Sequence, residues 1–386
     1  MNFFRYIIIF LFTVSSVYTI FAQKDPFLQC DIGSAYILPG YSGLPDYGPN
    51  YQLRVRYGNR LTDNKSWNKN YNYPYVSVNA FFSHNTNLAL GSIFAVYPDF
   101  GFILKEKKKY EMRISAGLGI AFFNKIYHPE YNPQNMLIGS YCTATGAADL
   151  LFRYKVSSQW SACLQAGVIH FSNGHTRLPN LGINMPYVML GTNYWFREEP
   201  KYQVRSKLAF DDARSKGVVR YGLGFHQFGE SAKPWGGPVY VNQVLSIALA
   251  HNYSPIAFLS FGVNFTYYDS FYHFMLDQEV HEVNTLFNES CMITVFAAHE
   301  FLFGKIGVYT ELGFDIYKPF YRKYALYYDN TLSLDETIKS FNSNKLGLQY
   351  HFFKPIEQHF DVMAGVYIKS NFGQADFLEC AISIAF

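Results

Sequence analysis

From residue 27 onward, apolar and polar residues alternate in short segments of about ten residues that are separated by turn-rich stretches. Successive side chains of a β-strand point to opposite faces, so a period of two predicts strands. No long segment has a helical period. The predicted strands are 27–38, 51–58, 73–83, 87–98, 111–124, 141–154, 160–172, 186–197, 218–228, 240–251, 257–270, 290–301, 305–317, 344–353, 359–371 and 376–386.

The amino-acid composition indicates that such strands would be stable in a membrane. Charged residues make up only 16% of the chain, against about 25% in soluble domains, while aromatic residues reach 19%. Strands that cross a membrane need about 9–11 residues each, and aromatic girdles mark both interfaces of a membrane barrel. The pattern therefore predicts an all-β protein, a transmembrane antiparallel β-barrel of the outer-membrane type.

Both ends of the chain support a location in the cell outer membrane. Arg5, the apolar run 7–14 and the small residue Ala22 are typical of a signal peptide over 1–22, with an uncleaved anchor as the alternative. The chain ends AISIAF at Phe386, which resembles the terminal aromatic strand by which bacterial outer-membrane barrels are recognised for assembly. A soluble β-sandwich with an apolar last strand is the alternative.

The two halves of the chain look related. At an offset of 198 the segment AGVIHFSN (166–173) lies over AGVYIKSN (364–371), and at an offset of 171 Gly91, Phe94, Tyr97 and Phe100 lie over Gly262, Phe265, Tyr268 and Phe271. We interpret this as a tandem duplication, although barrel strands also resemble one another by chance. The units would be 23–196 and 218–386, joined by a charged linker, 197–217.

The number of barrels is open at this stage. Open sheet edges are not tolerated in a membrane, and one closure is the simplest way to remove them. We therefore expect one continuous barrel of about 14–16 strands, with two tandem eight-stranded barrels as the alternative.

Several classes of function are disfavoured. The five cysteines are widely spaced and form no CxxC, so neither a disulfide framework nor a zinc site is indicated. No metal-ligand spacing, P-loop or glycine-rich dinucleotide turn is present, so we expect no metal and no cofactor. The net charge of +3 is no nucleic-acid signature.

One predicted strand, 160–172, ends in residues that can carry chemistry. Its even positions are apolar until His170 and Ser172, which share a face. An imidazole beside a hydroxyl on one face can activate it as a nucleophile, although such a pair at a strand end is usually ordinary surface. If both termini are periplasmic, this seventh strand ends at the cell exterior, where the outer leaflet is lipopolysaccharide.

The segment HFSNGHTRLPNLGIN (170–184) resembles the signature of the outer-membrane lipid A 3-O-deacylases (PagL-type), closely over 166–196 and more loosely over 27–196. The resemblance implies a serine–histidine–acid hydrolase on the outer barrel wall that removes an ester-linked acyl chain from lipid A. It implies that His170 is the general base and Ser172 the nucleophile. Candidates for the oxyanion site are Asn173, the backbone amide near Gly174, and Asn180.

The sequence departs from that family at Asn184, where the family has a catalytic Glu. Asn184 could orient His170, a carboxylate such as Glu130 or Asp149 could replace the missing charge, or this copy is slow. In the second half Ile368 stands where His170 does, so that copy should be inactive. The leading hypothesis is a lipid A (lipopolysaccharide) deacylase. The alternative is a non-enzymatic outer-membrane barrel, a pore or structural protein, that retains the motif.

Overall fold

The structure is a computed structural model that describes residues 25–38, 48–63, 65–199, 210, 213–229, 231, 236–278, 283–320, 334–371 and 374–386. The expected signal peptide and most of the expected linker lie outside these residues. The first barrel consists of β1 (Phe27–Tyr36), β2 (Pro49–Arg60), β3 (Tyr75–Asn85), β4 (Ser92–Glu106), β5 (Tyr110–Phe123), β6 (Cys142–Lys155), β7 (Trp160–Ser172) and β8 (Ile183–Trp195). The second consists of β9 (Arg214–Gln227), β10 (Val239–Ser254), β11 (Ala257–Tyr267), β12 (Cys291–Phe303), β13 (Ile306–Tyr317), β14 (Asn342–His351), β15 (Asp361–Asn371) and β16 (Gln374–Ala385).

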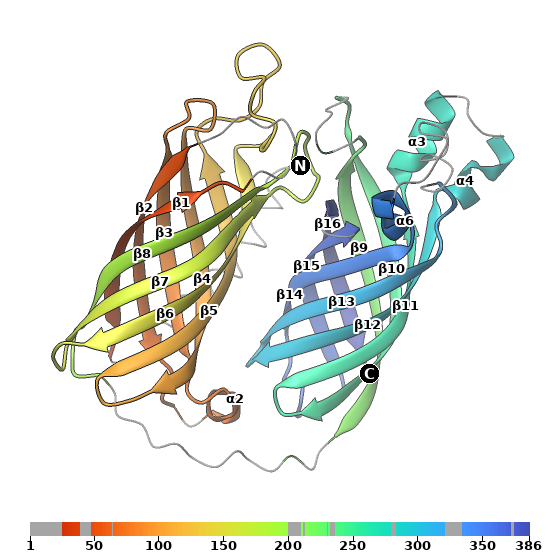
Figure 1. Cartoon of the computed structure of the whole chain (residues 1–386). Coiled ribbons are helices and arrows are strands. Elements are labelled where there is room, and N and C mark those ends of the chain that lie inside the picture. The colour runs from red at the N-terminus through yellow and green to blue at the C-terminus, as the bar shows by residue number, and fades with distance from the viewer. Residues whose placement is uncertain are drawn as a thin grey trace. The chain divides into compact units, whose positions relative to one another are not determined.

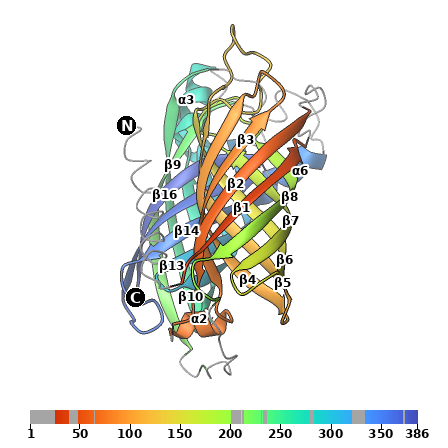
Figure 2. The same cartoon turned by 90° about the vertical axis from the view of Figure 1, so that its left-hand side faces the viewer.

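Two closed antiparallel barrels (Figure 1) confirm the predicted fold class, in the form that the sequence offered as its alternative. The continuous barrel favoured from the sequence is not formed. Strand β1 pairs with β8 from Phe27↔Trp195 to Ala35↔Tyr187, and Figure 2 shows β1 lying between β2 and β8. In the same way β16 pairs with β9. Each set of eight strands closes on itself and leaves no open sheet edge. The need to avoid open edges therefore does not distinguish one large barrel from two small ones.

Every predicted strand overlaps a strand of the structure, and the main differences concern boundaries. The fourth prediction, 87–98, begins too early, because residues 86–91 form a turn in which Gly91 has a φ of +63°. Strand β4 then continues to Glu106. Strand β9 begins at Arg214, inside the segment assigned to the linker.

The strand order also shows which of the two internal sequence similarities relates equivalent strands. The offset of 198 places β7 over β15, and each is the seventh strand of its barrel. The offset of 171 places β4 over β11, which are the fourth strand of one barrel and the third of the other. Only the first similarity therefore relates equivalent strands.

In both barrels the apolar side chains face outward and polar side chains face inward, which is the opposite of a soluble protein. On β7 the outward side chains include Leu164 and Val168, which are exposed, while Gln165 faces inward and is buried. Strand β10 follows the same rule, with Ile247 and Leu249 exposed on its outer face. Apolar residues outside and polar residues inside are what a barrel surrounded by lipid requires.

Ion pairs fill the interior of the first barrel. Arg54 Nε lies 3.3 Å from Asp31 Oδ2, and Arg54 Nη1 lies 3.1 Å from Asp149 Oδ2. Beside it, Arg56 Nη2 lies 3.0 Å from Asp99 Oδ2. An eight-stranded barrel is just wide enough for side chains to fill it, so this interior is a packed core.

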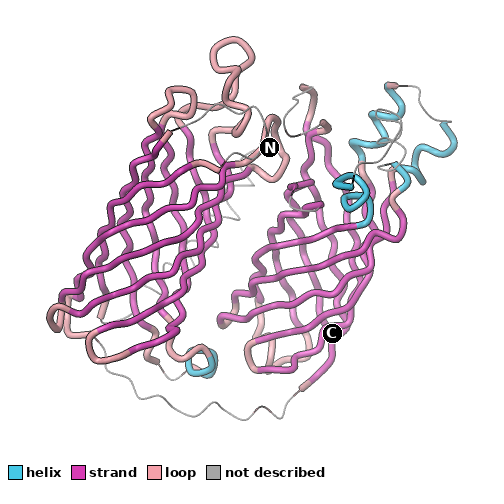
Figure 3. The backbone as a smooth tube through the Cα atoms, viewed as in Figure 1, coloured by secondary structure: helices cyan, strands magenta, loops and turns pink. Residues whose placement is uncertain are grey.

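The connections differ between the two ends of each barrel. The turns 156–159 and 304–305 lie at one end, and the longest connections, such as 124–141 and 268–290, lie at the other. Short turns face the periplasm and long loops face the exterior in such barrels, so β7 ends at the extracellular side. The helices lie in the connections (Figure 3): α2 (Ser66–Asn70), α3 (Asp269–Asp277), the 3-10 turn η1 (Val283–Thr285), α4 (Leu286–Glu289) and α6 (Leu334–Phe341). None of the helices in the described residues is long and apolar enough to span a membrane.

Candidate functional site

His170 lies on the outer wall of the first barrel, near the extracellular end of β7. Burial alternates along this strand: Ile169 and Phe171 are fully buried and face inward, while Val168 and His170 are exposed. The hydroxyl of Thr145, on the neighbouring strand β6, donates to the carbonyl oxygen of His170 over 3.0 Å. The imidazole therefore projects from the lipid-facing side of a rigid strand.

Strand register brings Asn184 to His170. The two residues are direct partners across β7 and β8, and His170 Nδ1 lies 2.8 Å from Asn184 Oδ1. An amide oxygen can only accept a hydrogen bond, so Nδ1 carries the proton. This tautomer leaves Nε2 with a lone pair, which is the form that a general base needs.

Ser172 is held by the loop that follows it. Asn180 Nδ2 donates to Ser172 Oγ over 3.0 Å, and Asn180 Oδ1 accepts from the backbone N–H of Asn173 over 3.1 Å. One amide side chain thus joins the end of β7 to the far side of the 173–182 loop. Asn180 Nδ2 is consequently the donor next to the hydroxyl oxygen of Ser172.

The other two residues expected at the oxyanion site, Asn173 and Gly174, help to shape the loop. The Asn173 side chain donates from Nδ2 to Ser140 Oγ over 3.1 Å. Gly174 follows with a φ of +65°, a left-handed conformation that favours glycine. Asn173 and Asn180 thus hold the loop by hydrogen bonds, and Gly174 provides its left-handed backbone turn.

Sequence reasoning missed the part played by Gly182. Its φ is +75°, and a Cβ atom placed there would lie 3.2 Å from His170 Cε1 and 3.2 Å from the carbonyl oxygen of Phe171. Its backbone N–H donates to the carbonyl oxygen of Leu137 over 3.1 Å. Gly182 therefore lets the loop pack against the imidazole, and the Gly-Ile pair before Asn184 was the signal in the sequence.

The structure excludes one of the two carboxylates that could have replaced the family's catalytic Glu. Asp149 faces the barrel interior, where it contacts Arg54 and Arg56 and accepts from Tyr187 Oη over 3.1 Å. It is on the opposite side of the wall from His170, so the suggestion that it replaces the acid is wrong. Across the described part of the chain, no hydrogen bond or ion pair joins Glu130 to His170. The partner of the imidazole is Asn184.

The equivalent strand of the second barrel has no such pair. On β15, Lys369 is buried and its Nζ lies 2.6 Å from Asp376 Oδ2 in the interior. Its neighbours Ile368 and Ser370 are on the outward side of the strand. The residue at the place of His170 is therefore aliphatic, and Ser370 has no base on its face.

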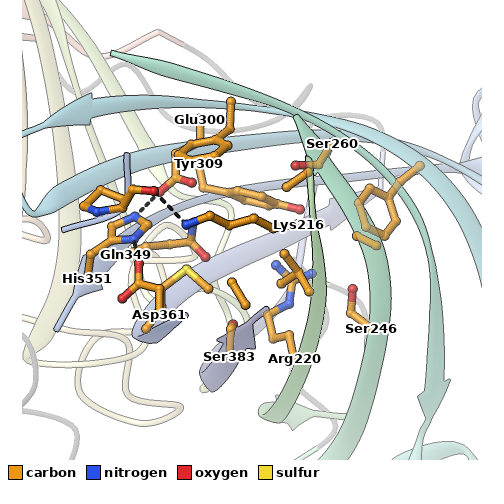
Figure 4. Close-up of a pocket in the computed structure, with 18 residues that line it drawn as sticks. Lys216, Arg220, Ser246, Ser260, Glu300, Tyr309, Gln349, His351, Asp361 and Ser383 are labelled. Atoms are coloured by element: carbon orange, nitrogen blue, oxygen red, sulfur yellow. Dashed lines mark hydrogen bonds and ion pairs between the residues drawn. The ribbon is translucent and has the colours of Figure 1, made fainter. Parts of the chain in front are cut away.

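A polar cluster inside the second barrel, shown in Figure 4, is a different kind of site. His351 Nε2 lies 2.8 Å from Glu300 Oε1, and His351 Nδ1 lies 2.6 Å from Asp361 Oδ2. The adjoining cavity has a volume of about 50 Å³, whereas ligand pockets usually have about 300 Å³ or more. This space suits a few waters, and the cluster is an internal ion network.

Three carboxylates at the periplasmic end of the first barrel lie close enough to share a metal ion: those of Glu106, Glu111 and Glu199. Cations of the protein already surround them, because Arg153 contacts Glu111 and Glu199, and Lys155 lies 2.8 Å from Glu199. Burial raises the pKa of Glu199, but these cations outweigh it and bring that pKa down to about 2. The carboxylates are therefore neutralised without a metal.

Taken together, the apolar exterior, the filled polar interior and the closed antiparallel sheets define an outer-membrane β-barrel protein. Comparison with protein families agrees for each barrel. Residues 46–193 match the family model of lipid A 3-O-deacylase (PagL), and residues 215–386 match that of the acyloxyacyl hydrolase C-terminal domain. The chain belongs to this PagL-type family of outer-membrane deacylases.

More distant likenesses add little to that assignment. Neisserial surface protein A (NspA) has 12% identity and a TM-score of 0.31, covering 45% of this chain and 99% of its own. The outer membrane enzyme PagL has 19% identity and a TM-score of 0.31, covering 43% of this chain and 97% of its own. The β-domain of the Bordetella autotransporter BrkA has 9% identity and a TM-score of 0.23, with coverages of 94% and 99%. Comparison with curated proteins found no match.

Proposed function

We propose that the first barrel is an esterase that removes an ester-linked acyl chain from lipid A in the outer leaflet of the outer membrane. The observation that carries the proposal is the hydrogen bond between His170 and Asn184 on the lipid-facing wall, two residues before Ser172. The family match to lipid A 3-O-deacylases supports the substrate class. Lipopolysaccharide occupies the leaflet that the extracellular end of β7 would meet.

The chemistry follows from the tautomer of His170. As Ser172 Oγ bonds to the ester carbonyl carbon, its proton moves to the lone pair of His170 Nε2. The carbon–oxygen bond to the sugar then breaks, and the sugar oxygen takes that proton. Water, deprotonated by the same nitrogen, then attacks the acyl-serine. The bond to Ser172 Oγ breaks, the serine oxygen takes the proton back from Nε2, and the fatty acid is released. Asn184 is a positioning residue here: it holds the ring, but it adds no negative charge beside the imidazolium.

Charge on the carbonyl oxygen needs a donor during both steps. Asn180 Nδ2 is the candidate that the geometry favours, because it already lies 3.0 Å from Ser172 Oγ. The backbone amide of Gly174 is a second candidate. Asn173 contributes indirectly, since its contacts with Asn180 and Ser140 shape the loop.

The test is release of fatty acid from purified lipopolysaccharide, measured by mass spectrometry on both products. We expect Ser172→Ala and His170→Ala to abolish release. Ser34→Ala is the matched control, because Ser34 is an exposed, outward serine on β1 away from the site, and this variant should keep full activity. Full activity in Ser172→Ala would refute the mechanism.

The competing function is a structural barrel that inherited the motif without its activity. Asn184 favours this alternative, because an uncharged partner weakens a serine hydrolase. A pore is less well supported, since ion pairs such as Arg54–Asp149 cross the first interior and Arg220–Glu311, at 3.2 Å, crosses the second. The lipopolysaccharide assay separates the two functions: a chain with no activity at all, folded as a barrel, would be structural.

A further inference from the structure

The connection between β11 and β12, residues 268–290, is anchored on the extracellular end of the second barrel. The backbone N–H of Tyr268 donates to the carbonyl oxygen of Ser290 over 2.9 Å, which closes its base. Phe271 and Met275 of α3 and Leu286 of α4 are buried in one apolar cluster with Tyr268. The two helices are therefore packed onto the barrel, and α4 has a defined orientation.

The other side of α4 carries an exposed aromatic ring. Phe287 is 62% exposed, and its ring stacks on Tyr267 with centroids 5.3 Å apart and an interplanar angle of 24°. Tyr317, at the end of β13, donates from its hydroxyl to the carbonyl oxygen of Asn288 over 3.1 Å. We call Tyr267, Phe287 and Tyr317 the aromatic ledge.

The aromatic ledge continues the lipid-facing wall of the barrel. Tyr267 occupies the last outward position of β11, in line with the exposed residues Phe261 and Phe265. On β13 the exposed residues Phe314 and Ile316 lie on the outer face, and a register shift after Asp315 pairs Tyr317 with Ile293 and brings its ring to the same face. An exposed apolar surface of this kind marks an interaction site, and here it has no break from the surface that lipid covers.

We propose that the aromatic ledge is seated in the outer leaflet, at the boundary between the acyl chains and the head groups of the outer-membrane glycolipid. Tyrosine rings place an apolar body in the hydrocarbon and a hydroxyl in the polar layer, which suits this depth. Phe287, raised beyond the strand end on α4, extends the apolar band locally toward the exterior. The occupant is lipid because the surface is continuous with the lipid-facing wall, and the proposal does not depend on hydrolase activity.

Quenching by brominated lipid tests this placement in the full chain. Phe287→Trp would be reconstituted in vesicles of dibrominated phosphatidylcholine, and the emission it adds to the parent protein would be compared with that in unbrominated vesicles. Phe265→Trp, on the outer face of β11, is the lipid-facing reference. Leu88→Trp, an exposed position in the short 86–91 connection at the extracellular end of the first barrel, is the aqueous reference.

We expect the added emission of Phe287→Trp to be quenched about as strongly as that of Phe265→Trp, and iodide to quench only Leu88→Trp. Quenching of Phe287→Trp by iodide and not by brominated lipid would overturn the proposal. Protection from both quenchers would also overturn it, since a protein surface would then cover the ring. Heat-modifiable migration in gels would verify that each variant is folded.

Discussion

At the scale of single residues, the site rests on two amide side chains. Asn184 sets the tautomer of His170, and Asn180 links Ser172 to the loop that follows β7. The motif in the sequence named residues that the structure brings into contact, His170 with Asn184 and Ser172 with Asn180, because their spacing is local. The contacts of Asn180 and the close approach of Gly182 could not be predicted, since they depend on how the 173–182 loop folds back.

Restoring a carboxylate at position 184 should raise the rate. Asn184→Glu would place a negative charge where the amide oxygen now meets His170 Nδ1, and in the proposed mechanism that charge would stabilise the imidazolium formed when Ser172 attacks. We expect kcat on lipopolysaccharide to increase by about tenfold or more. Asn184→Ala should lower it, because the ring loses its partner.

Asn184→Gln is the control for side-chain length, and it should not reproduce the gain of Asn184→Glu. An unchanged or lower kcat in Asn184→Glu, with the barrel folded, would show that charge beside His170 does not limit this enzyme.

At the scale of elements, the strands were predictable because a wall with lipid on one side and packed side chains on the other forces alternation. Strand β7 shows this most clearly, since its predicted and observed bounds coincide. The short helices were not predicted, because α3 and α4 are held by packing against the barrel mouth and carry no long period of their own. The closing pair β1–β8 joins segments far apart in sequence, which local pattern cannot reveal.

The interior ion pairs should be essential to the first barrel. Arg54 contacts Asp31 and Asp149, and all three side chains are buried. Arg54→Leu would leave the buried Asp31 without its cation and Asp149 with Arg56 alone, and we expect a loss of about 3–5 kcal/mol in the free energy of unfolding. Urea unfolding in lipid vesicles, followed by gel mobility, measures it.

Arg197→Leu is the surface control for this change. Its guanidinium is exposed and lies 3.8 Å from Asp25, so removing it should cost less than about 1 kcal/mol. Equal effects of the two substitutions would mean that the interior network does not stabilise the barrel.

The periplasmic end of the first barrel should weaken in acid. The pKa of Glu199 falls from its ordinary value of 4.5 to about 2, because Arg153 and Lys155 outweigh the effect of burial. The folded state therefore gains stability from this group above pH 4.5 and loses it as the pH falls toward 2. Thermal unfolding in detergent between neutral and acid pH should show this loss in the parent chain.

Glu199→Gln should be less stable than the parent at neutral pH and should lose less on acidification. Glu198→Gln, at an exposed neighbouring position, should behave like the parent. The same loss on acidification in Glu199→Gln as in the parent would exclude Glu199 as its source.

At the scale of the whole molecule, one chain carries two separate closures of eight strands. The charged stretch after the aromatic ending of the first unit was the local sign of this arrangement, but deciding it required the pairing of β1 with β8 and of β9 with β16. The two barrels are not equivalent in chemistry. His170 has its counterpart in Ile368, so the candidate activity belongs to one barrel, and the second keeps the architecture without the base.

Two narrow, filled barrels should not conduct ions. A single sheet of sixteen strands would enclose an aqueous channel, whereas eight strands leave room only for side chains. Arg54 with its carboxylates occupies the first interior, and Arg220 with Glu311 occupies the second. The purified chain in planar bilayers should therefore show no steady conductance above that of the protein-free membrane, while a porin reconstituted in the same way does. A sustained porin-like conductance would contradict the packed interiors, because ions would then have to pass where these side chains lie.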